Sequence, residues 1–178
     1  MGIAFGGYVN IPISKVLSFR QELMFSQKGW QKNIQHNIAA RLDGEEVHNY
    51  RLEIVETTNL NYLELPLLAR VNLTTDRITK PYILGGLSLG INLSSKAKYE
   101  SEETEYIYGV KVLDEEDSGT YDRDDIRTFD LGLVTGIGVE ENNLIFELRY
   151  TYGLIDIKQG GDYDLKNSAI SITAGYTF

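Results

Sequence analysis

The sequence has no cysteine, only two histidines, and fewer basic residues (17) than acidic ones (26), which gives a formal net charge of -9. The lack of cysteine excludes disulfide scaffolds, thiolate metal sites and cysteine nucleophiles. Two histidines leave little for imidazole chemistry. The shortage of basic residues disfavours nucleic-acid binding, which requires a basic surface. We therefore expect no nucleic-acid partner and no cofactor.

Long apolar runs are also lacking. No stretch approaches the roughly 18 consecutive apolar residues that a membrane-spanning helix requires, and the residues after Met1 have neither the basic nor the apolar region of a signal peptide. A transmembrane β-barrel is compatible with both absences, because its strands alternate apolar and polar residues over about ten positions. The length of 178 residues and the hydrophobic content of 42% predict one folded domain over residues 1–178.

Most of the negative charge lies in one segment. Residues 94–126 contain eleven acidic and four basic residues. The spacing around Asp122, Asp124 and Asp125 does not follow an EF-hand loop, which needs a glycine and a distant glutamate in fixed places. We predict a solvated loop here, and no metal site.

Hydrophobic residues recur with a period of two, which is typical of β-strands. Seven segments show this alternation: 3–11, 17–28, 62–71, 82–92, 129–140, 144–152 and 169–178. Short turns at 12–16, 74–80 and 141–143 alternate with long polar loops at about 31–57, 94–126 and 156–167. The pattern predicts an all-β, antiparallel up-and-down barrel with the long loops at one end.

The two faces of these strands differ in composition. The apolar faces carry no charged residue, and a charge facing lipid near the bilayer midplane costs about 2–4 kcal/mol. The opposite faces are rich in glycine, serine and alanine, which suit the interior of a narrow barrel. They also carry nine charged residues, for which we predict an internal ion-pair network in the lumen: Arg20, Glu22, Lys28, Glu64, Arg70, Asp130, Glu140, Glu147 and Arg149.

Several segments resemble one family of membrane barrels. They are GGYVNIPISKVLSFRQELMFSQKG (6–29), YLELPLLARVN (62–72), KPYILGGLSLG (80–90), FDLGLVTGIGVE (129–140), FELRYTYGL (146–154) and the terminal AGYTF (174–178). In order and spacing they are similar to the Bacteroidota-type outer-membrane β-barrel family, often labelled porin-family or PorT-like. The resemblance implies a location in the outer membrane of a Gram-negative bacterium, in contact with its lipid. Tyr176 and Phe178 resemble the C-terminal signal that the barrel-insertion machinery reads.

The strand count departs from the family pattern. Family members usually carry a further strand before the first segment seen here, and single-chain bacterial barrels have an even number of strands. We therefore expect about eight strands in the complete barrel, with a signal peptide, one strand and one loop upstream of the present sequence. A less favoured alternative is that another chain closes the barrel, because an unpaired edge in lipid leaves backbone groups unsatisfied.

Candidate catalytic and sugar-binding residues have simpler explanations. Ser88 lies in a G-x-S-x-G motif, but in the middle of a predicted strand and after both histidines, whereas a nucleophile elbow needs a strand-to-helix turn and a later histidine. We predict that the protein is not an enzyme. A girdle at the membrane interface accounts for most of six aromatic residues: Trp30, Tyr62, Tyr82, Tyr150, Tyr152 and Tyr176.

Three functions are compatible with the sequence. An eight-stranded barrel is filled by side chains, which favours a structural or partner-binding role, with the long loops as the recognition surface of an outer-membrane complex. The balanced charges of the predicted lumen leave a narrow porin-like transport channel as an alternative. A soluble ligand-binding calyx, which would hide its apolar face, is a further alternative.

Overall fold

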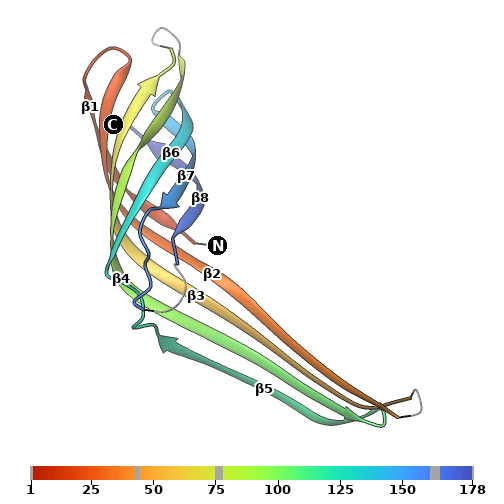
Figure 1. Ribbon diagram of the computed structural model, residues 1–178. Helices are drawn as coiled ribbons and strands as arrows, with labels where there is room; N and C mark the ends of the chain where they lie inside the picture. The colour runs from red at the N-terminus through yellow and green to blue at the C-terminus, as the bar shows by residue number, and fades with distance from the viewer. Residues whose placement is uncertain (1, 43–44, 75–77, 161–164, 178) are drawn as a thin grey trace. The chain divides into compact units, whose positions relative to one another are not determined.

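A computed structural model of the chain describes residues 2–42, 45–74, 78–160 and 165–177 (Figure 1). These residues form eight strands: β1 (Ala4–Pro12), β2 (Leu17–Leu42), β3 (Glu45–Asn72), β4 (Thr79–Ile107), β5 (Val110–Asp122), β6 (Phe129–Glu141), β7 (Leu144–Gly153) and β8 (Ser168–Tyr176). No helix in the described ranges is long and apolar enough to cross a membrane.

All eight strands belong to one sheet, as the alternation predicts. Its path runs β1-β2-β3-β4-β6-β7-β8, and β5 branches off by pairing with β4. Neighbouring strands run in opposite directions (Figure 1). The seven strands of the path correspond to the seven predicted segments, and the short turns after β1 and β6 fall where the sequence places them; residues 75–77 of the turn after β3 lie outside the described residues. The all-β, antiparallel prediction is confirmed.

Two of the predicted long loops are wrong. Residues 31–57 and 94–126 lie mostly in strands, because β2, β3 and β4 continue far beyond their amphipathic parts and β5 pairs with the end of β4. These stretches are polar on both faces, so backbone pairing forms strands there without a hydrophobic alternation. Residues 156–167 form no strand where they are described, as predicted, apart from an isolated bridge between Ile126 and Lys158.

The chain divides into two compact units. Unit 1 consists of Met1–Lys28, Asn61–Ser94 and Asp125–Phe178, and unit 2 consists of Gly29–Leu60 and Ser95–Asp124. Strands β2, β3 and β4 contribute residues to both. The period-two segments lie almost entirely in unit 1, whereas unit 2 is built from the polar continuations.

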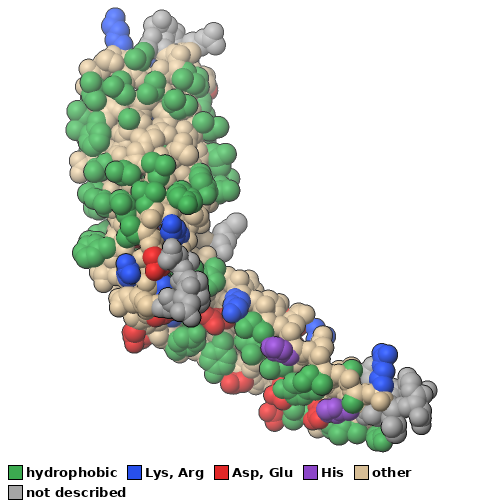
Figure 2. Space-filling model, viewed as in Figure 1, with side chains coloured by type: hydrophobic (Ala, Val, Ile, Leu, Met, Phe, Trp, Pro, Cys, Tyr) green, Lys and Arg blue, Asp and Glu red, His purple; other side chains and the backbone are tan. Residues whose placement is uncertain are grey.

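Unit 1 exposes its apolar face and buries its polar one. Leu133 and Ile137 on the outward face of β6 are 48% and 60% exposed, whereas Val134 between them is 4% exposed. In the neighbouring strand β4, Ile83 is 45% exposed and Leu84 3%. Figure 2 shows hydrophobic side chains and few charges over this surface. The distribution is the opposite of that expected for a soluble calyx.

The two ends of the sheet path are the strands β1 and β8. Within the described residues β1 pairs only with β2, and β8 only with β7. The strands of the path alternate in direction, so these two edges run parallel to each other. A side-chain hydrogen bond joins them, between the hydroxyls of Tyr8 and Thr177, which are 2.9 Å apart.

Candidate functional site

The nine residues predicted for the lumen all lie in unit 1, and each takes part in an ion pair. The pairs form three groups, on the polar inner face of the sheet. The first group joins Arg20 and Glu22 of β2 with Glu147 and Arg149 of β7. The second joins Arg70 with Glu140, and the third joins Lys28 with Glu64 and Asp130.

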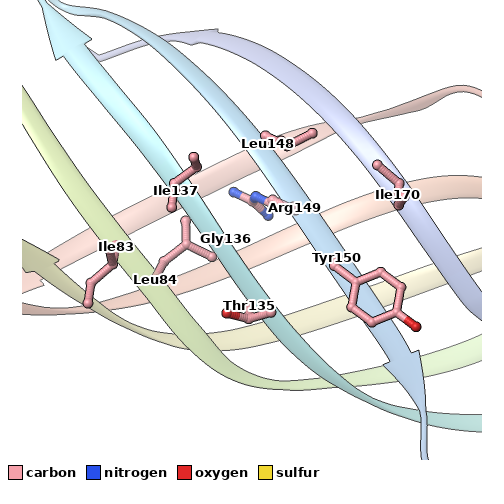
Figure 3. A pocket seen from close by; sticks show the side chains of 9 residues that line it. All are labelled: Ile83, Leu84, Thr135, Gly136, Ile137, Leu148, Arg149, Tyr150 and Ile170. Carbon is pink, nitrogen blue, oxygen red and sulfur yellow. The ribbon is translucent and has the colours of Figure 1, made fainter.

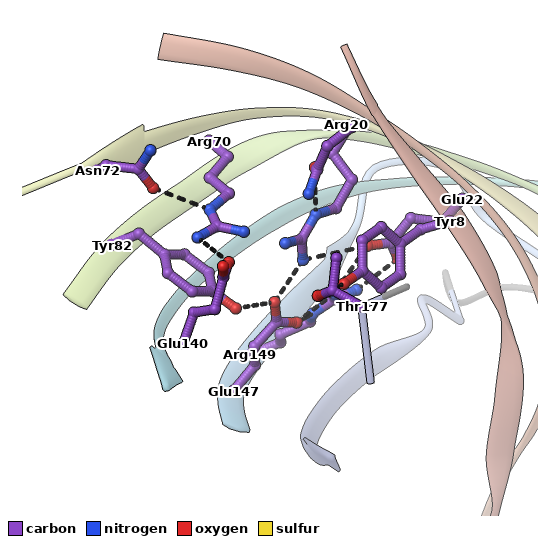
Figure 4. A network of polar contacts seen from close by, with 11 residues as sticks. Tyr8, Arg20, Glu22, Arg70, Asn72, Tyr82, Glu140, Glu147, Arg149 and Thr177 are labelled. Carbon is purple, nitrogen blue, oxygen red and sulfur yellow. Dashed lines mark hydrogen bonds and ion pairs between the residues drawn. The ribbon is translucent and has the colours of Figure 1, made fainter. Parts of the chain in front are cut away.

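The first group connects β2 to β7, which are not neighbours in the sheet (Figure 4). Arg149 donates through both terminal nitrogens to Glu22, at 2.6 and 2.8 Å, and its Nε donates to Glu147 at 2.7 Å. Arg20, fully buried, donates to Glu147 and, through Nε, to the side-chain oxygen of Asn10 at 3.0 Å. Two cations and two anions therefore neutralise one another in the interior, as buried charges require.

Tyr82 links the first group to the second. Its hydroxyl donates to Glu147, and the guanidinium carbon of Arg70 lies 3.7 Å from the centre of its ring. Arg70 in turn donates to Glu140 at 2.6 Å and to Asn72 at 3.0 Å (Figure 4). A Cβ at Gly138 would lie 2.5 Å from the Tyr82 ring, so glycine at this position makes room for the ring.

The third group has its own polar neighbours. The Lys28 ammonium lies 2.5 Å from Glu64 and 3.5 Å from Asp130, and 5.1 Å from the centre of the Tyr62 ring. Asn167, which follows the loop after β7, donates to the Tyr62 hydroxyl at 3.0 Å and to Asp130 at 2.9 Å.

Large side chains fill the inner face between these groups. Leu68, Tyr82, Leu84 and Val134 form a buried hydrophobic cluster, and Tyr62 is fully buried. Small barrels are packed with side chains in this way. The arrangement can hold the strands together, but it leaves bulky, paired side chains where an open pore would need space.

Aromatic residues divide between the two faces. Tyr150, Tyr152 and Tyr176 point outward and are 43% to 53% exposed, in agreement with a girdle. Tyr62 and Tyr82 are buried on the inner face, so they do not belong to the girdle that the sequence predicts for most of the six aromatic residues. Trp30 lies in unit 2, with the Arg123 guanidinium 5.5 Å from its ring centre. Of the predicted insertion signal, Tyr176 is exposed at the end of β8, and Phe178 lies outside the described residues.

The outward face of unit 1 has a shallow depression of about 440 Å³ (Figure 3). It is lined mainly by apolar side chains of β4, β6, β7 and β8: Ile83, Leu84, Thr135, Gly136, Ile137, Leu148, Arg149, Tyr150 and Ile170. The depression therefore lies on a largely apolar surface.

Unit 2 buries few side chains: among its described residues only Thr58, Leu60, Ser95 and Ala97 are buried, and the others are half-buried or exposed. Along β5 only Leu113 and Gly119 are half-buried, and the other residues are exposed. The sequence of unit 2 contains fifteen of the 26 acidic residues and seven of the 17 basic ones. Glu102 lies directly opposite Glu116, and Glu103 opposite Glu115. Like charges directly opposite each other destabilise a sheet, so the β4–β5 ladder carries unfavourable electrostatics.

Polar contacts tie the strands of unit 2 together. Glu53 accepts hydrogen bonds from Gln35 at 3.0 Å, Asn33 at 3.2 Å and Arg51 at 3.0 Å, and these donors lower the pKa of its carboxyl. His48 Nε2 lies 2.6 Å from a carboxylate oxygen of Glu105. The described residues contain no group of three or more histidine, aspartate or glutamate side chains arranged to hold a metal ion.

The loop after β7 is held against residues 125–127 of unit 1. The amides of Arg127 and Gln159 donate to Ile157 and Asp125. Asp156 accepts hydrogen bonds from the amides of Leu165 at 2.8 Å and Lys158 at 2.9 Å, which lower the pKa of its carboxyl. The Asp156 carboxylate therefore anchors this loop by accepting hydrogen bonds from two backbone N–H groups.

The neutral partners of the ion pairs were not predicted. Asn10, Tyr62 and Tyr82 occupy inward positions of the alternating segments. Their position in the alternation therefore indicates that they face the ion pairs. Asn167 lies outside any alternating segment, and nothing in its neighbourhood indicates its role. Ser88 of the G-x-S-x-G motif is buried within β4, opposite Gly132, and not at a strand-to-helix turn.

Comparison with known proteins identifies a family for this chain. Residues 1–159 match the family described as outer membrane protein beta-barrel domain. No curated protein and no solved structure matches the chain.

Proposed function

Because the chain belongs to the outer membrane protein β-barrel family and is an integral protein of the outer membrane, we propose that it has a structural or partner-binding role, exercised through unit 2. Within that family we assign it to the PorT-like barrels of Bacteroidota, on the segments that carry the resemblance. Long connections of such barrels face outward, so unit 2 is the outward recognition surface. We propose no catalytic activity.

The observation that carries this proposal is the difference between the two units. Unit 1 is filled by paired charges and buried rings, which favours an anchor over a conduit. The described part of unit 2 buries only four side chains, of which two, Leu60 and Ala97, are apolar. Sheets without a hydrophobic face to pack are marginally stable alone. A partner that binds to this sheet would stabilise it and would account for its presence in the protein.

Photo-crosslinking in the native outer membrane tests this role. We place a photo-reactive phenylalanine analogue at Gln35 or Ser118 in unit 2, and at Ile137 on the outward face of unit 1 as a control. The proposal predicts one reproducible protein adduct from the unit 2 positions and lipid adducts from Ile137. Absence of any protein adduct from unit 2 would contradict it.

A narrow channel is the second candidate, favoured by the balance of cations and anions on the inner face. Planar-bilayer recordings separate the two functions. A filled interior predicts no large, stable conductance. A stable conductance that changes on replacing Arg20, Arg70 or Arg149 by methionine would establish the channel and overturn the structural role.

A further inference from the structure

The hairpin that joins β4 and β5 ends in exposed hydrophobic side chains. Its tip residues Tyr106, Ile107, Tyr108, Val110 and Val112, hereafter the hairpin tip, are 39%, 41%, 73%, 64% and 51% exposed. Figure 2 shows hydrophobic and acidic side chains side by side along this part of the chain. Contiguous exposed apolar residues rimmed by polar ones mark interaction sites.

The backbone of the hairpin tip holds Tyr108 in an uncommon conformation. Ile107 pairs with Val110, and the two residues between them have φ angles of 49° (Tyr108) and 73° (Gly109), which is the pattern of a type I′ turn. Asparagine, aspartate or glycine is preferred at the first position of this turn. A bulky aromatic residue in the left-handed region is uncommon and worth explaining.

A β-bulge follows the turn. Tyr106 pairs with Lys111 and Glu105 with Leu113, so Val112 is the additional residue without a cross-strand partner. Bulges redirect side chains and are over-represented next to functional sites. The turn and the bulge are independent departures from a regular hairpin, and both involve an exposed apolar side chain.

Acidic residues surround the hairpin tip on both strands of the hairpin. Asp114 pairs with Lys111 and Glu105 with His48, and the rest form two directly opposed pairs, Glu102 with Glu116 and Glu103 with Glu115. The opposed glutamate pairs repel each other in the free protein, and a basic surface would relieve this repulsion. An anionic lipid surface would instead be repelled, so the charges favour a protein over a membrane as the occupant.

We propose that the hairpin tip inserts into an apolar cleft of a partner protein whose rim carries lysine and arginine. This inference rests on the proposed partner-binding role and identifies the part of unit 2 that makes the central contact. Tyr108 supplies the anchor, since exposed aromatic residues are enriched among the residues that dominate binding. The acidic rim supplies orientation and a salt-dependent attraction.

The test uses the full-length protein in its native outer membrane. A photo-reactive phenylalanine analogue at Tyr108 is compared with the same group at Gln35 and Ser118. We expect position 108 to form an adduct with one protein, at an apolar cleft bordered by lysine or arginine in that protein. A lipid adduct, an adduct with a second copy of this chain, or no adduct from position 108 overturns the inference.

Substitution of Tyr108 then separates binding from folding. Tyr108→Asn places asparagine before Gly109, the preferred type I′ sequence, so thermal stability should stay equal or rise. We expect affinity for the purified crosslinked partner to fall about tenfold or more. Tyr121→Asn, an equivalent change of an exposed tyrosine in β5 away from the hairpin tip, should leave affinity unchanged. Equal affinity of Tyr108→Asn and wild type overturns the inference.

The crosslinking results at the three positions also distinguish this inference from the proposed function on which it rests. Protein adducts from positions 35 or 118 without one from 108 leave the partner-binding role standing and remove the hairpin tip as its anchor. No protein adduct from any of the three positions removes both.

Discussion

The guanidinium of Arg149 in β7 donates two hydrogen bonds to the carboxylate of Glu22 in β2, at 2.6 and 2.8 Å. The Glu22 side chain is 2% exposed and that of Arg149 11%. The pair therefore joins two strands that are not adjacent in the sheet, through a two-point contact in the interior of unit 1. Its consequences for stability are the first that experiment can check.

Replacing Arg149 by methionine should destabilise the protein by about 3–5 kcal/mol, because it leaves buried carboxylates short of a cation. The free energy of unfolding, measured by urea titration in lipid vesicles, checks this value. Lys98→Met is the matched control, since the Lys98–Glu100 pair of unit 2 is as short, at 2.6 Å, but exposed. Exposed pairs contribute little, so this variant should unfold like the wild type.

A double replacement tests why the Arg149→Met variant loses stability. Removing both charges, as in Glu22→Met with Arg149→Met, should recover part of the stability, because apolar residues of similar volume can substitute for a buried pair. An Arg149→Met variant as stable as the wild type would contradict the inferred role of the network.

The loop after β7 should loosen in acid. The hydrogen bonds from the amides of Leu165 and Lys158 lower the pKa of the Asp156 carboxyl in the folded chain. Such a group contributes stability that is complete above its unfolded pKa of about 3.9 and is lost as the pH falls through the folded value. Amide hydrogen-exchange protection at Lys158 and Leu165, measured from about pH 6 to about pH 2, should fall at the acidic end.

The matched variant for this loop is Asp156→Asn, which keeps an acceptor oxygen but cannot titrate. Its protection should be lower than that of the wild type at neutral pH and should lack the acidic step. Identical pH profiles in both proteins would show that the carboxylate does not anchor the loop.

The edges of β1 and β8 should be closed by one further strand. Both edges run in the same direction, and unpaired backbone groups are not tolerated in lipid, so one strand antiparallel to both satisfies them together. We expect cysteines that replace Tyr8 and Thr177 to form no disulfide. A strand between β1 and β8 would hold the two Cα atoms farther apart than the roughly 7 Å that a disulfide permits. Cysteines at Phe146 and Ala174, which are directly opposite in β7 and β8, are the positive control.

The origin of that strand is a separate question with its own readout. A rapid, complete disulfide between positions 8 and 177 would instead show that β1 and β8 adjoin. Mass spectrometry of the native barrel then identifies which polypeptide contributes the closing strand when the disulfide is absent.

The sequence predicted unit 1 well because hydrophobicity there is tied to geometry. Leu133 and Val134 are both apolar. Leu133 is exposed and Val134 is buried because they occupy alternate positions of the strand and so point to opposite faces. The same alternation also put Arg20, Glu147 and Arg149 on the same face. Which of the charges pair with each other depends on strand order and stagger, and the alternation contains no information on stagger.

The strands of unit 2 were not predicted because their sequences lack a hydrophobic alternation. Glu102 and Glu103 are consecutive acids that point to opposite faces of β4, so no amphipathic pattern distinguishes this strand from a loop. The turn at Tyr108 lacks the usual asparagine, which removed the remaining local signal for a hairpin. Acidic composition alone favoured a solvated loop.

The orientation of the apolar face is tested most directly by collision measurements on single spin labels in bilayers. The chain contains no cysteine, so labels can be placed one at a time on β4 and β6. Our account predicts frequent collisions with lipid-dissolved oxygen at Ile83, Leu87, Leu133 and Ile137, and few at Leu84, Ser88 and Val134. The reverse phase, or no alternation at all, would contradict it.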